Sequence, residues 1–398
     1  MFQGLKYLIV GSGFFGATLA ERIANDLGEN VVVIDRRTHF GGNSYSEIDP
    51  ETGIECHKYG SHIFHTQNAK IWEYVNRFTS FNQYRHKVWT TYQGRVFSMP
   101  INLSTINQYY GKAFSPTEAK TFLDQEVARD RVANPKNLEE QAINLIGRPL
   151  YEAFIKGYTA KQWETDPTKL PANIITRLPV RYHYDDRYFS DTYEGIPTEG
   201  YTKIFERMLK NPKITVKLGT DFFDIRNQIP AETLKTCQII YTGPIDRYFD
   251  YKYGDLSWRT IDLEKEIVKV NDFQGTSVMN YAEEKVPYTR IHEFKHFHPE
   301  RKHENGKSVI FREFSRFAKK TDEPYYPINQ ESDKAILTKY QEDAKKLSNV
   351  IFGGRLGSYK YYDMHQAIGA ALLTYDRDIK PRATGVPYQS PMSAGTET

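Results

Sequence analysis

The chain has 398 residues, of which 39% are hydrophobic and 26% are charged. This length predicts two or three lobes with a substantial core, and the composition excludes a disordered protein, a collagen and a coiled coil. The formal net charge is only +3, and no block of lysine and arginine marks a nucleic-acid-binding face. No apolar run reaches the roughly 18–20 residues of a membrane span.

The cellular compartment is predicted from the cysteines and the N-terminus. The two cysteines, Cys56 and Cys237, are too few for a disulfide framework, and no secretory signal precedes the first strand. We therefore expect a cytoplasmic protein. Aromatic residues make up 14% of the chain and include 29 tyrosines, which predicts half-buried walls or a polar pocket lined with rings.

The first predicted elements are a strand, a glycine-rich turn, a helix and a second strand. An apolar run ends at Gly11-Ser12-Gly13-Phe14-Phe15-Gly16, helical periodicity covers 17–27, and Val31–Ile34 is followed by Asp35. This pattern is typical of dinucleotide binding, because the glycines let the backbone approach a pyrophosphate and the helix N-terminus supplies N–H groups. Asp35 is expected to accept hydrogen bonds from a ribose. The alternative is a glycine turn needed only for packing.

A mostly helical region is expected next, over 71–150. Apolar residues recur at helical spacing over 71–78 and again over 117–132. The following stretch, 162–199, has no long apolar period and carries four prolines, which predicts a long ordered loop or a mobile lid.

The rest of the chain predicts antiparallel strands and then a return to the first sheet. Short alternating stretches fill 237–317, and a helix is expected over 335–347. Val350–Phe352 is expected as a strand before a glycine pair, with another helix from Met364. The first sheet is therefore expected to collect segments from both ends of the chain.

The segment His292-Glu293-Phe294-Lys295-His296 matches the spacing of zinc sites. Two zinc ligands four residues apart must share one face of a helix, but prolines flank this segment and its neighbours alternate like strands. On a strand the two imidazoles would lie about 13 Å apart, too far to hold one ion. We therefore expect polar residues on a sheet face and no metal.

Several segments carry a resemblance to known families. The pair Gly41-Gly42, soon after the acidic residue, is similar to FAD-binding proteins of the glutathione-reductase and amine-oxidase type. Six further motifs, in chain order, resemble the bacterial UDP-galactopyranose mutases over all but about the last dozen residues: Tyr59-Gly60-Ser61-His62-Ile63-Phe64-His65-Thr66, Tyr158-Thr159-Ala160-Lys161-Gln162-Trp163, Arg177-Leu178-Pro179-Val180-Arg181, Tyr288-Thr289-Arg290-Ile291, Pro324-Tyr325-Tyr326-Pro327, and Gly354-Arg355 through Tyr361-Tyr362-Asp363-Met364. Ser61 departs from the proline that the family often carries before this histidine.

The resemblance implies an isomerase that interconverts UDP-galactopyranose and UDP-galactofuranose without net redox change. It implies that N5 of reduced FAD attacks the anomeric carbon, that UDP leaves, and that the sugar ring opens through a flavin iminium and recloses. It also implies a reductant such as NAD(P)H, a homo-oligomer, and a role in cell-wall polysaccharide biosynthesis. The alternatives are an FAD-dependent oxidase of the same fold, a mutase for a related nucleotide sugar such as UDP-N-acetylgalactosamine, and a non-catalytic nucleotide-binding regulator.

The resemblance also implies site residues. The catalytic candidates are Arg177 and Arg290 at the diphosphate and His62 near the flavin ring. The implied cofactor contacts are Gly11, Gly13, Phe14, Gly16, Asp35, Arg36, Gly42, Asn43, His62, Ile63, Asp221, Phe222, Arg355, Asp363, Met364 and Ile368. The implied substrate contacts are Phe154, Tyr158, Thr159, Gln162, Trp163, Arg177, Tyr188, Asn280, Arg290, Tyr326 and Tyr361. Helical core remains the alternative for Phe154 and Tyr158, and a satisfied core histidine for His62.

The predicted fold class is α/β, with an FAD-binding Rossmann-like βαβ domain, an inserted helical domain and an antiparallel β-sheet domain. The predicted boundaries are 1–81 with 198–242 and 330–385 for the FAD-binding domain, 82–160 for the helical domain, 161–197 with 243–329 for the sheet domain including the lid, and 386–398 for a C-terminal tail.

Overall fold

A five-stranded parallel sheet forms the first part of the fold. The computed structural model describes residues 4–175, 180–303 and 305–386. The strands are ordered β16-β10-β1-β2-β9 and comprise β1 (Tyr7–Val10), β2 (Val31–Ile34), β9 (Ile214–Lys217), β10 (Gln238–Tyr241) and β16 (Val350–Phe352). Every pairing is parallel, and all four residues of β2 are buried. A run of β-branched residues suits this sheet because both of its faces are covered.

Side-chain alternation divides the strands between two cores. Ile9, Val31 and Val33 face one layer of helices, which comprises α1 (Phe14–Arg22), α2 (Ala69–Asn76), α8 (Tyr201–Met208) and α14 (Met364–Thr374). Leu8, Val32 and Ile34 face the other side, with α9 (Phe222–Ile225) and α10 (Ala231–Thr236) nearby. The remaining helices of this half are α11 (Ile245–Tyr248), α12 (Glu331–Lys345), α13 (Gly354–Gly357) and α15 (Lys380–Thr384).

A seven-stranded sheet forms the second part, in the order β15-β11-β14-β13-β12-β6-β7. Its strands are β6 (Val88–Tyr92), β7 (Arg95–Met99), β11 (Trp258–Val268), β12 (Val278–Tyr281), β13 (Arg290–Glu293), β14 (Ser308–Phe317) and β15 (Tyr326–Pro327). The pairings are antiparallel except between β12 and β6. Two small sheets pair β3 (Ser46–Ile48) with β4 (Glu55–His57) and β5 (Phe64–Thr66) with β8 (Tyr193–Gly195).

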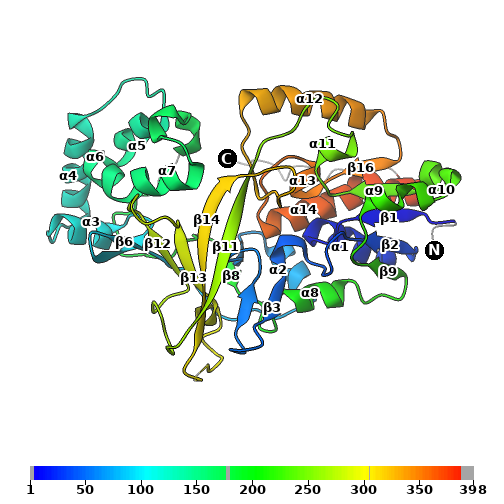
Figure 1. Cartoon of the computed structure of the whole chain (residues 1–398), viewed down its shortest axis with the longest axis horizontal. Helices are drawn as coiled ribbons and strands as arrows, with labels where there is room; N and C mark the ends of the chain where they lie inside the picture. The colour runs from blue at the N-terminus through cyan, green and yellow to red at the C-terminus, as the bar shows by residue number, and fades with distance from the viewer. Residues whose placement is uncertain (1–3, 176–179, 304, 387–398) are drawn as a thin grey trace, which may run out of the picture.

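A helical unit completes the fold, and Figure 1 shows it on the far side of the long strands β11 and β14 from the parallel sheet. Capping boxes at Asn102 and Ser115 begin two of its helices, because their side chains accept N–H groups of the first turn. Its apolar faces share one core. The helices are α3 (Leu103–Tyr110), α4 (Pro116–Arg129), α5 (Leu138–Ile146), α6 (Arg148–Leu150) and α7 (Gly157–Trp163).

Two sequence-based expectations need correction here. The prediction that 71–150 is mostly helical missed β6 and β7, which pair with each other and, through β12, with the sheet. Their five-residue runs are too short to stand out between longer helical periods, although Val88 and Thr90 alternate inward as strand residues do. The strand expected over His292–His296 ends at Glu293, where a 3-10 turn begins.

None of the helices in the described ranges is long and apolar enough to cross a membrane. Of the predicted C-terminal tail, 386–398, only Val386 belongs to the described residues.

Candidate active site

The glycine turn after β1 is packed against backbone and side chains. Gly11 has φ +106°, and a Cβ there would lie 1.9 Å from Oγ1 of Thr242. A Cβ on Gly16 would lie 2.0 Å from the carbonyl oxygen of Gly11. At Gly13 the nearest atom to a Cβ is Cα of Gly42, at 3.9 Å. The fold therefore requires glycine at 11 and 16, whereas position 13 leaves room that a ligand can approach.

Asp35 fixes this turn from the end of β2. Its Oδ2 accepts hydrogen bonds from the Ser12 amide at 2.9 Å and the Ser12 hydroxyl at 2.6 Å. Its Oδ1 accepts one from the Arg37 amide at 3.0 Å. Three of about four acceptor positions are thus used by the protein, so Asp35 has room for one further donor. The carboxylate shapes the turn in addition to the expected ribose contact.

One cavity extends from the glycine turn to the seven-stranded sheet. Fifteen of the sixteen residues implied as cofactor contacts line it: Gly11, Gly13, Phe14, Gly16, Asp35, Arg36, Gly42, Asn43, His62, Ile63, Asp221, Phe222, Arg355, Asp363 and Met364. The other residue, Ile368, is fully buried in the core against α1, so the structure does not place it on the cavity wall. Arg290, Tyr326 and Tyr361, implied as substrate contacts, line the same cavity.

A charged cluster occupies the sheet face at the far end of the cavity. Arg290 on β13 lies opposite Glu313 on β14, and His292 shares its face because it is two residues further along the strand. Nε of Arg290 is 3.1 Å from Oε1 of Glu313, and Nε2 of His292 is 3.0 Å from Oε2. The hydroxyl of Thr289 lies 3.2 Å from Oε1 and 3.0 Å from the backbone carbonyl oxygen of Glu313. This ion pair restricts where the guanidinium can lie, although Nε of Arg290 has no hydrogen-bond partner among the described residues.

The protonation states of this cluster follow from its charges. Burial alone would raise the pKa of Glu313, but Arg290 and His292 lower it to about 2. Burial alone would lower the pKa of Arg290, but the Glu313 carboxylate raises it above its usual value. The pair is therefore ionised at neutral pH, and the cavity contains a fixed positive charge suited to an anionic ligand.

The pKa of Glu313 predicts how the stability of the protein depends on pH. Since its folded pKa lies below the ordinary 4.5, the stabilisation is complete above about pH 5 and is lost as the pH falls toward 2. Going from pH 5 to 3 should cost the wild type about 2 kcal/mol more than Glu313→Gln. Urea unfolding at both pH values measures this difference. Equal losses in the two proteins would contradict it.

One of the implied tyrosine contacts is a direct partner of Arg290. The Tyr158 hydroxyl, on α7, accepts a hydrogen bond from Nη2 of Arg290. The rings of Tyr326 and Tyr361 stack with centroids 5.8 Å apart on the cavity wall. Tyr188 packs edge-on against Phe189 and is half exposed. These phenols offer hydroxyl groups from four separate segments.

Four of the remaining substrate candidates, Phe154, Thr159, Gln162 and Trp163, lie on or near α7 and outside the cavity lining. Phe154 is 5% exposed and packs against Tyr92, Phe97 and Tyr109, as the core alternative expected. Thr159 is buried, and Gln162 and Trp163 are half-buried. The Oδ1 atom of Asn280, which pairs with Arg290 across β12 and β13, is buried without a hydrogen-bond partner among the described residues. Arg177 lies outside the described residues.

Polar anchors fix α7 against the sheet. The Lys161 ammonium donates to the carbonyls of Tyr281, Glu283 and Tyr288 at 2.6, 2.9 and 3.0 Å. The Gln162 carbonyl accepts from Arg259 and from Ser315, both at 2.8 Å. The helix α7, which carries four of the implied substrate contacts, is therefore tied to the sheet that carries Arg290.

His62 lines the cavity as a neutral ring. Burial lowers its pKa to about 4. Its Nδ1–H donates to the Gly60 carbonyl at 2.7 Å, so Nε2 carries a lone pair. If this ring contacts a reduced flavin, it does so as a neutral hydrogen-bonding group and not as a cation.

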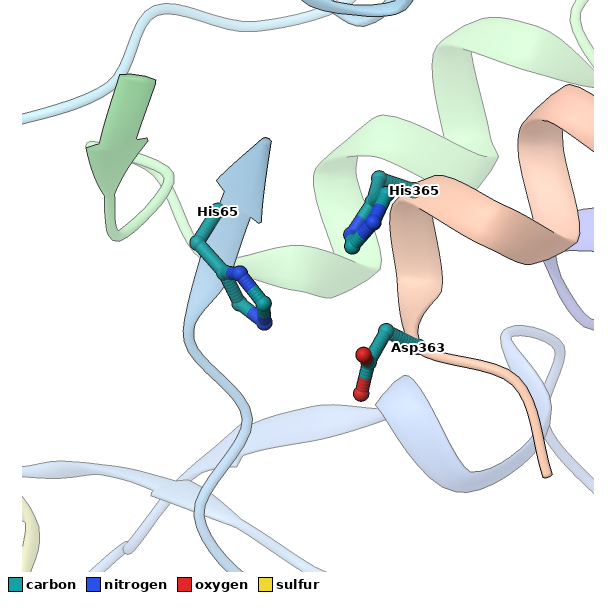
Figure 2. Close-up of side chains that lie close together, drawn as sticks. All are labelled: His65, Asp363 and His365. Atoms are coloured by element: carbon teal, nitrogen blue, oxygen red, sulfur yellow. The ribbon is translucent and has the colours of Figure 1, made fainter. Parts of the chain in front are cut away.

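A second histidine cluster stands at the N-terminus of α14. Figure 2 shows His65 on β5 together with Asp363 and His365, whose ligand-type atoms lie within 4.8 Å of one another. Asp363 caps α14 in a capping box, and Nδ1 of His65 is paired with Asp191. Nδ1 of His365 is buried without a hydrogen-bond partner among the described residues. The cluster places the His65 imidazole and the Asp363 carboxylate at the cavity wall, beside the N-terminus of α14.

Several cavity residues escaped the sequence analysis. Glu313 was seen only as a member of an alternating strand, and His292 only as part of the segment with zinc-site spacing. A charged residue on the inward face of such a strand is nevertheless a signal for a buried ion pair. Glu323 was also missed; its carboxylate is 2.6 Å from both Arg36 and Arg37 at the other end of the cavity. The partners of these charges are distant in sequence, so no local pattern reveals them.

Comparisons with known proteins identify relatives of this chain. The family model for UDP-galactopyranose mutase matches residues 153–361, and that for an NAD(P)-binding Rossmann-like domain matches 9–78. A probable UDP-galactopyranose mutase of Klebsiella pneumoniae is 45% identical over 369 residues, which cover 93% of each chain. The dTDP-fucopyranose mutase of Escherichia coli is 43% identical over 371 residues, covering 92% of this chain and 96% of that one.

The fold has a solved counterpart. A crystal structure of reduced UDP-galactopyranose mutase superposes with a TM-score of 0.70 over 93% of both chains, at 17% identity. That likeness shows the fold, while the family model and the identity to the curated relatives show the family. The chain therefore belongs to the UDP-galactopyranose mutase family and is an isomerase.

Proposed function

We propose that this enzyme interconverts UDP-galactopyranose and UDP-galactofuranose with reduced FAD as its cofactor. The observation that supports this most is the cavity that joins a dinucleotide-type glycine turn to the half-buried, charged Arg290. A ligand with a diphosphate needs such a cation. An oxidase of the same fold would have no need for an arginine fixed by Glu313 at this place.

The residues present fit FAD. Gly13 offers an open backbone face at the N-terminus of α1, where N–H groups suit a pyrophosphate. Asp35 has one acceptor position left, and the Arg36 and Arg247 guanidinium groups stand at the same end of the cavity. When bound and reduced, FAD would supply its electron-rich N5 as the nucleophile for the anomeric carbon. The reaction would then need no net redox change. We also propose that a reductant such as NAD(P)H reduces the bound FAD.

The protein then contributes binding and charge. Arg290 holds the diphosphate and stabilises the negative charge that UDP gains as it leaves the anomeric carbon. The Tyr158 hydroxyl accepts a hydrogen bond from one terminal nitrogen of the same guanidinium. The other terminal nitrogen remains available to a phosphate oxygen. The hydroxyls of Tyr188, Tyr326 and Tyr361 are proposed to donate to the phosphates. Arg177 is proposed as the second arginine at the diphosphate.

The name of the Escherichia coli relative raises a second candidate substrate, dTDP-fucopyranose. It differs from UDP-galactopyranose by a methyl group on the base and by the hydroxyl groups lost from the sugar and ribose. We expect kcat/KM for UDP-galactofuranose to exceed that for dTDP-fucofuranose by at least about tenfold, as lost polar contacts cost more than an apolar mismatch. Parallel assays by liquid chromatography measure the ratio. A ratio below one would assign the dTDP sugar instead.

A further inference from the structure

A serine hydroxyl extends the charged cluster away from Arg290. Oγ of Ser61 is 2.5 Å from Nδ1 of His292, whose other nitrogen faces Glu313. A carboxylate only accepts hydrogen bonds, so Nε2 of His292 carries the hydrogen. Nδ1 of His292 and the Ser61 hydroxyl therefore share a hydrogen bond, whichever of the two groups donates. The chain of contacts therefore runs from Ser61 through His292 and Glu313 to Arg290.

The backbone around Ser61 is fixed on both sides. Gly60 has φ +92°, and a Cβ there would lie 3.3 Å from Cδ1 of Ile261, so this loop lies directly on the sheet face. The His62 amide donates to Nδ1 of His57 at 3.1 Å, and the His57 ring stacks on Phe297 in the core. Ser61 is therefore a rigid support for the His292 ring.

Within this series of four contacting residues, His292 is the one whose contacts depend on the orientation of its ring. A half-turn of the imidazole about its Cβ–Cγ bond replaces both nitrogens by carbons at the two contact points. Glu313 would then lose the His292 donor and keep only Thr289 and Arg290. The Ser61 hydroxyl opposes that half-turn, because it has a partner in one orientation only.

We propose that Ser61 is a positioning residue for Arg290, acting through His292 and Glu313. The inference rests on the proposed function, in which Arg290 binds the diphosphate of the nucleotide sugar. It adds that the loop carrying His62 on the cofactor side of the cavity sets the orientation of the arginine on the substrate side. Ser61 itself need not touch either ligand.

A double-mutant cycle tests this proposal in the flavin-loaded full-length enzyme. Ser61→Ala should lower kcat/KM about five- to tenfold and weaken UDP binding by a similar factor, as expected for one lost hydrogen bond. In the Glu313→Gln background, Ser61→Ala should lower kcat/KM and UDP affinity by less than twofold. Ser61→Thr, which keeps a hydroxyl, should restore most of the loss. If Glu313→Gln does not fold, His292→Gln replaces it in the cycle.

Ser277→Ala is the matched control. Ser277 is buried and its hydroxyl lies 2.5 Å from that of Tyr84, so this variant loses a hydrogen bond of the same length outside the cavity lining. It should lower thermal stability as much as Ser61→Ala without changing UDP affinity. The proposal is overturned if Ser61→Ala binds UDP like the wild type, or if its effect is undiminished beside Glu313→Gln.

The UDP measurement separates this inference from the proposed function. Titration of UDP into the enzyme reports on Arg290 whether or not the sugar is converted. Loss of UDP affinity in Ser61→Ala, together with a wild type that leaves UDP-galactofuranose unchanged, would refute the proposed function alone. Normal turnover in the wild type with unaltered UDP binding in Ser61→Ala would refute the positioning role alone.

Discussion

Replacing Arg290 by alanine should lower kcat about a hundred- to a thousandfold, the usual effect of removing one fixed donor from a developing negative charge. The structure gives the reason: the guanidinium is charged, oriented by Glu313 and directed into the cavity that also contains the glycine turn. UDP affinity should fall as well, because we propose that Arg290 binds the diphosphate both before and during the reaction. Turnover and UDP binding are measured on protein with matched flavin content.

The control for Arg290→Ala addresses the Glu313 carboxylate, which this variant leaves without its partner. Arg290→Ala removes the partner of the buried Glu313, which by itself destabilises a fold. The double variant Arg290→Ala with Glu313→Gln removes that unpaired charge, so it should recover stability but not activity. If activity returned with stability, the arginine would have a structural role only. Flavin content should change little in either variant.

Alanine at two glycines should separate folding from cofactor binding. Gly13→Ala should fold with a melting temperature within about 2 °C of the wild-type apoprotein, because its Cβ meets nothing closer than 3.9 Å. It should lose FAD affinity about a hundredfold if the pyrophosphate approaches this backbone, since a hundredfold corresponds to about 3 kcal/mol of steric cost. The ratio of flavin absorbance to protein absorbance measures the outcome.

Gly16→Ala should disturb the fold itself as well as flavin binding. Its Cβ would stand 2.0 Å from the Gly11 carbonyl, so the turn itself must move. We expect a lower melting temperature for the apoprotein as well as lost flavin. Full flavin content in Gly13→Ala would contradict a pyrophosphate at this turn, whereas equal melting temperatures for the two variants would contradict the packing argument.

The sequence predicts the parts of this fold whose signals are local. The glycine turn, β1, α1 and β2 follow from spacing that spans about thirty residues, and the comparisons confirm the Rossmann-like unit. The α/β fold class is confirmed as well. The short strands β6 and β7 were missed, because the pairing that stabilises them comes from β12, almost two hundred residues away.

In the candidate site too, residues with a local sequence signal were predicted, and residues that depend on distant pairing were not. Arg290 came from a resemblance over four residues, and the structure places it in the cavity with most of the implied cofactor contacts. Glu313, which orients Arg290, could not be found in this way because strand register alone brings the two together. Ile368, implied as a cofactor contact, packs in the core and does not line the cavity, so its role as a contact stays a prediction.

The requirement for a reduced flavin tests the central claim most directly. The purified enzyme is incubated with UDP-galactofuranose under anaerobic conditions, once oxidised and once after dithionite, and the products are separated by liquid chromatography. We predict that UDP-galactopyranose forms only with the reduced enzyme, in many turnovers per flavin and without consumption of reductant. Equal conversion by the oxidised enzyme, or none by the reduced one, would contradict the proposed function.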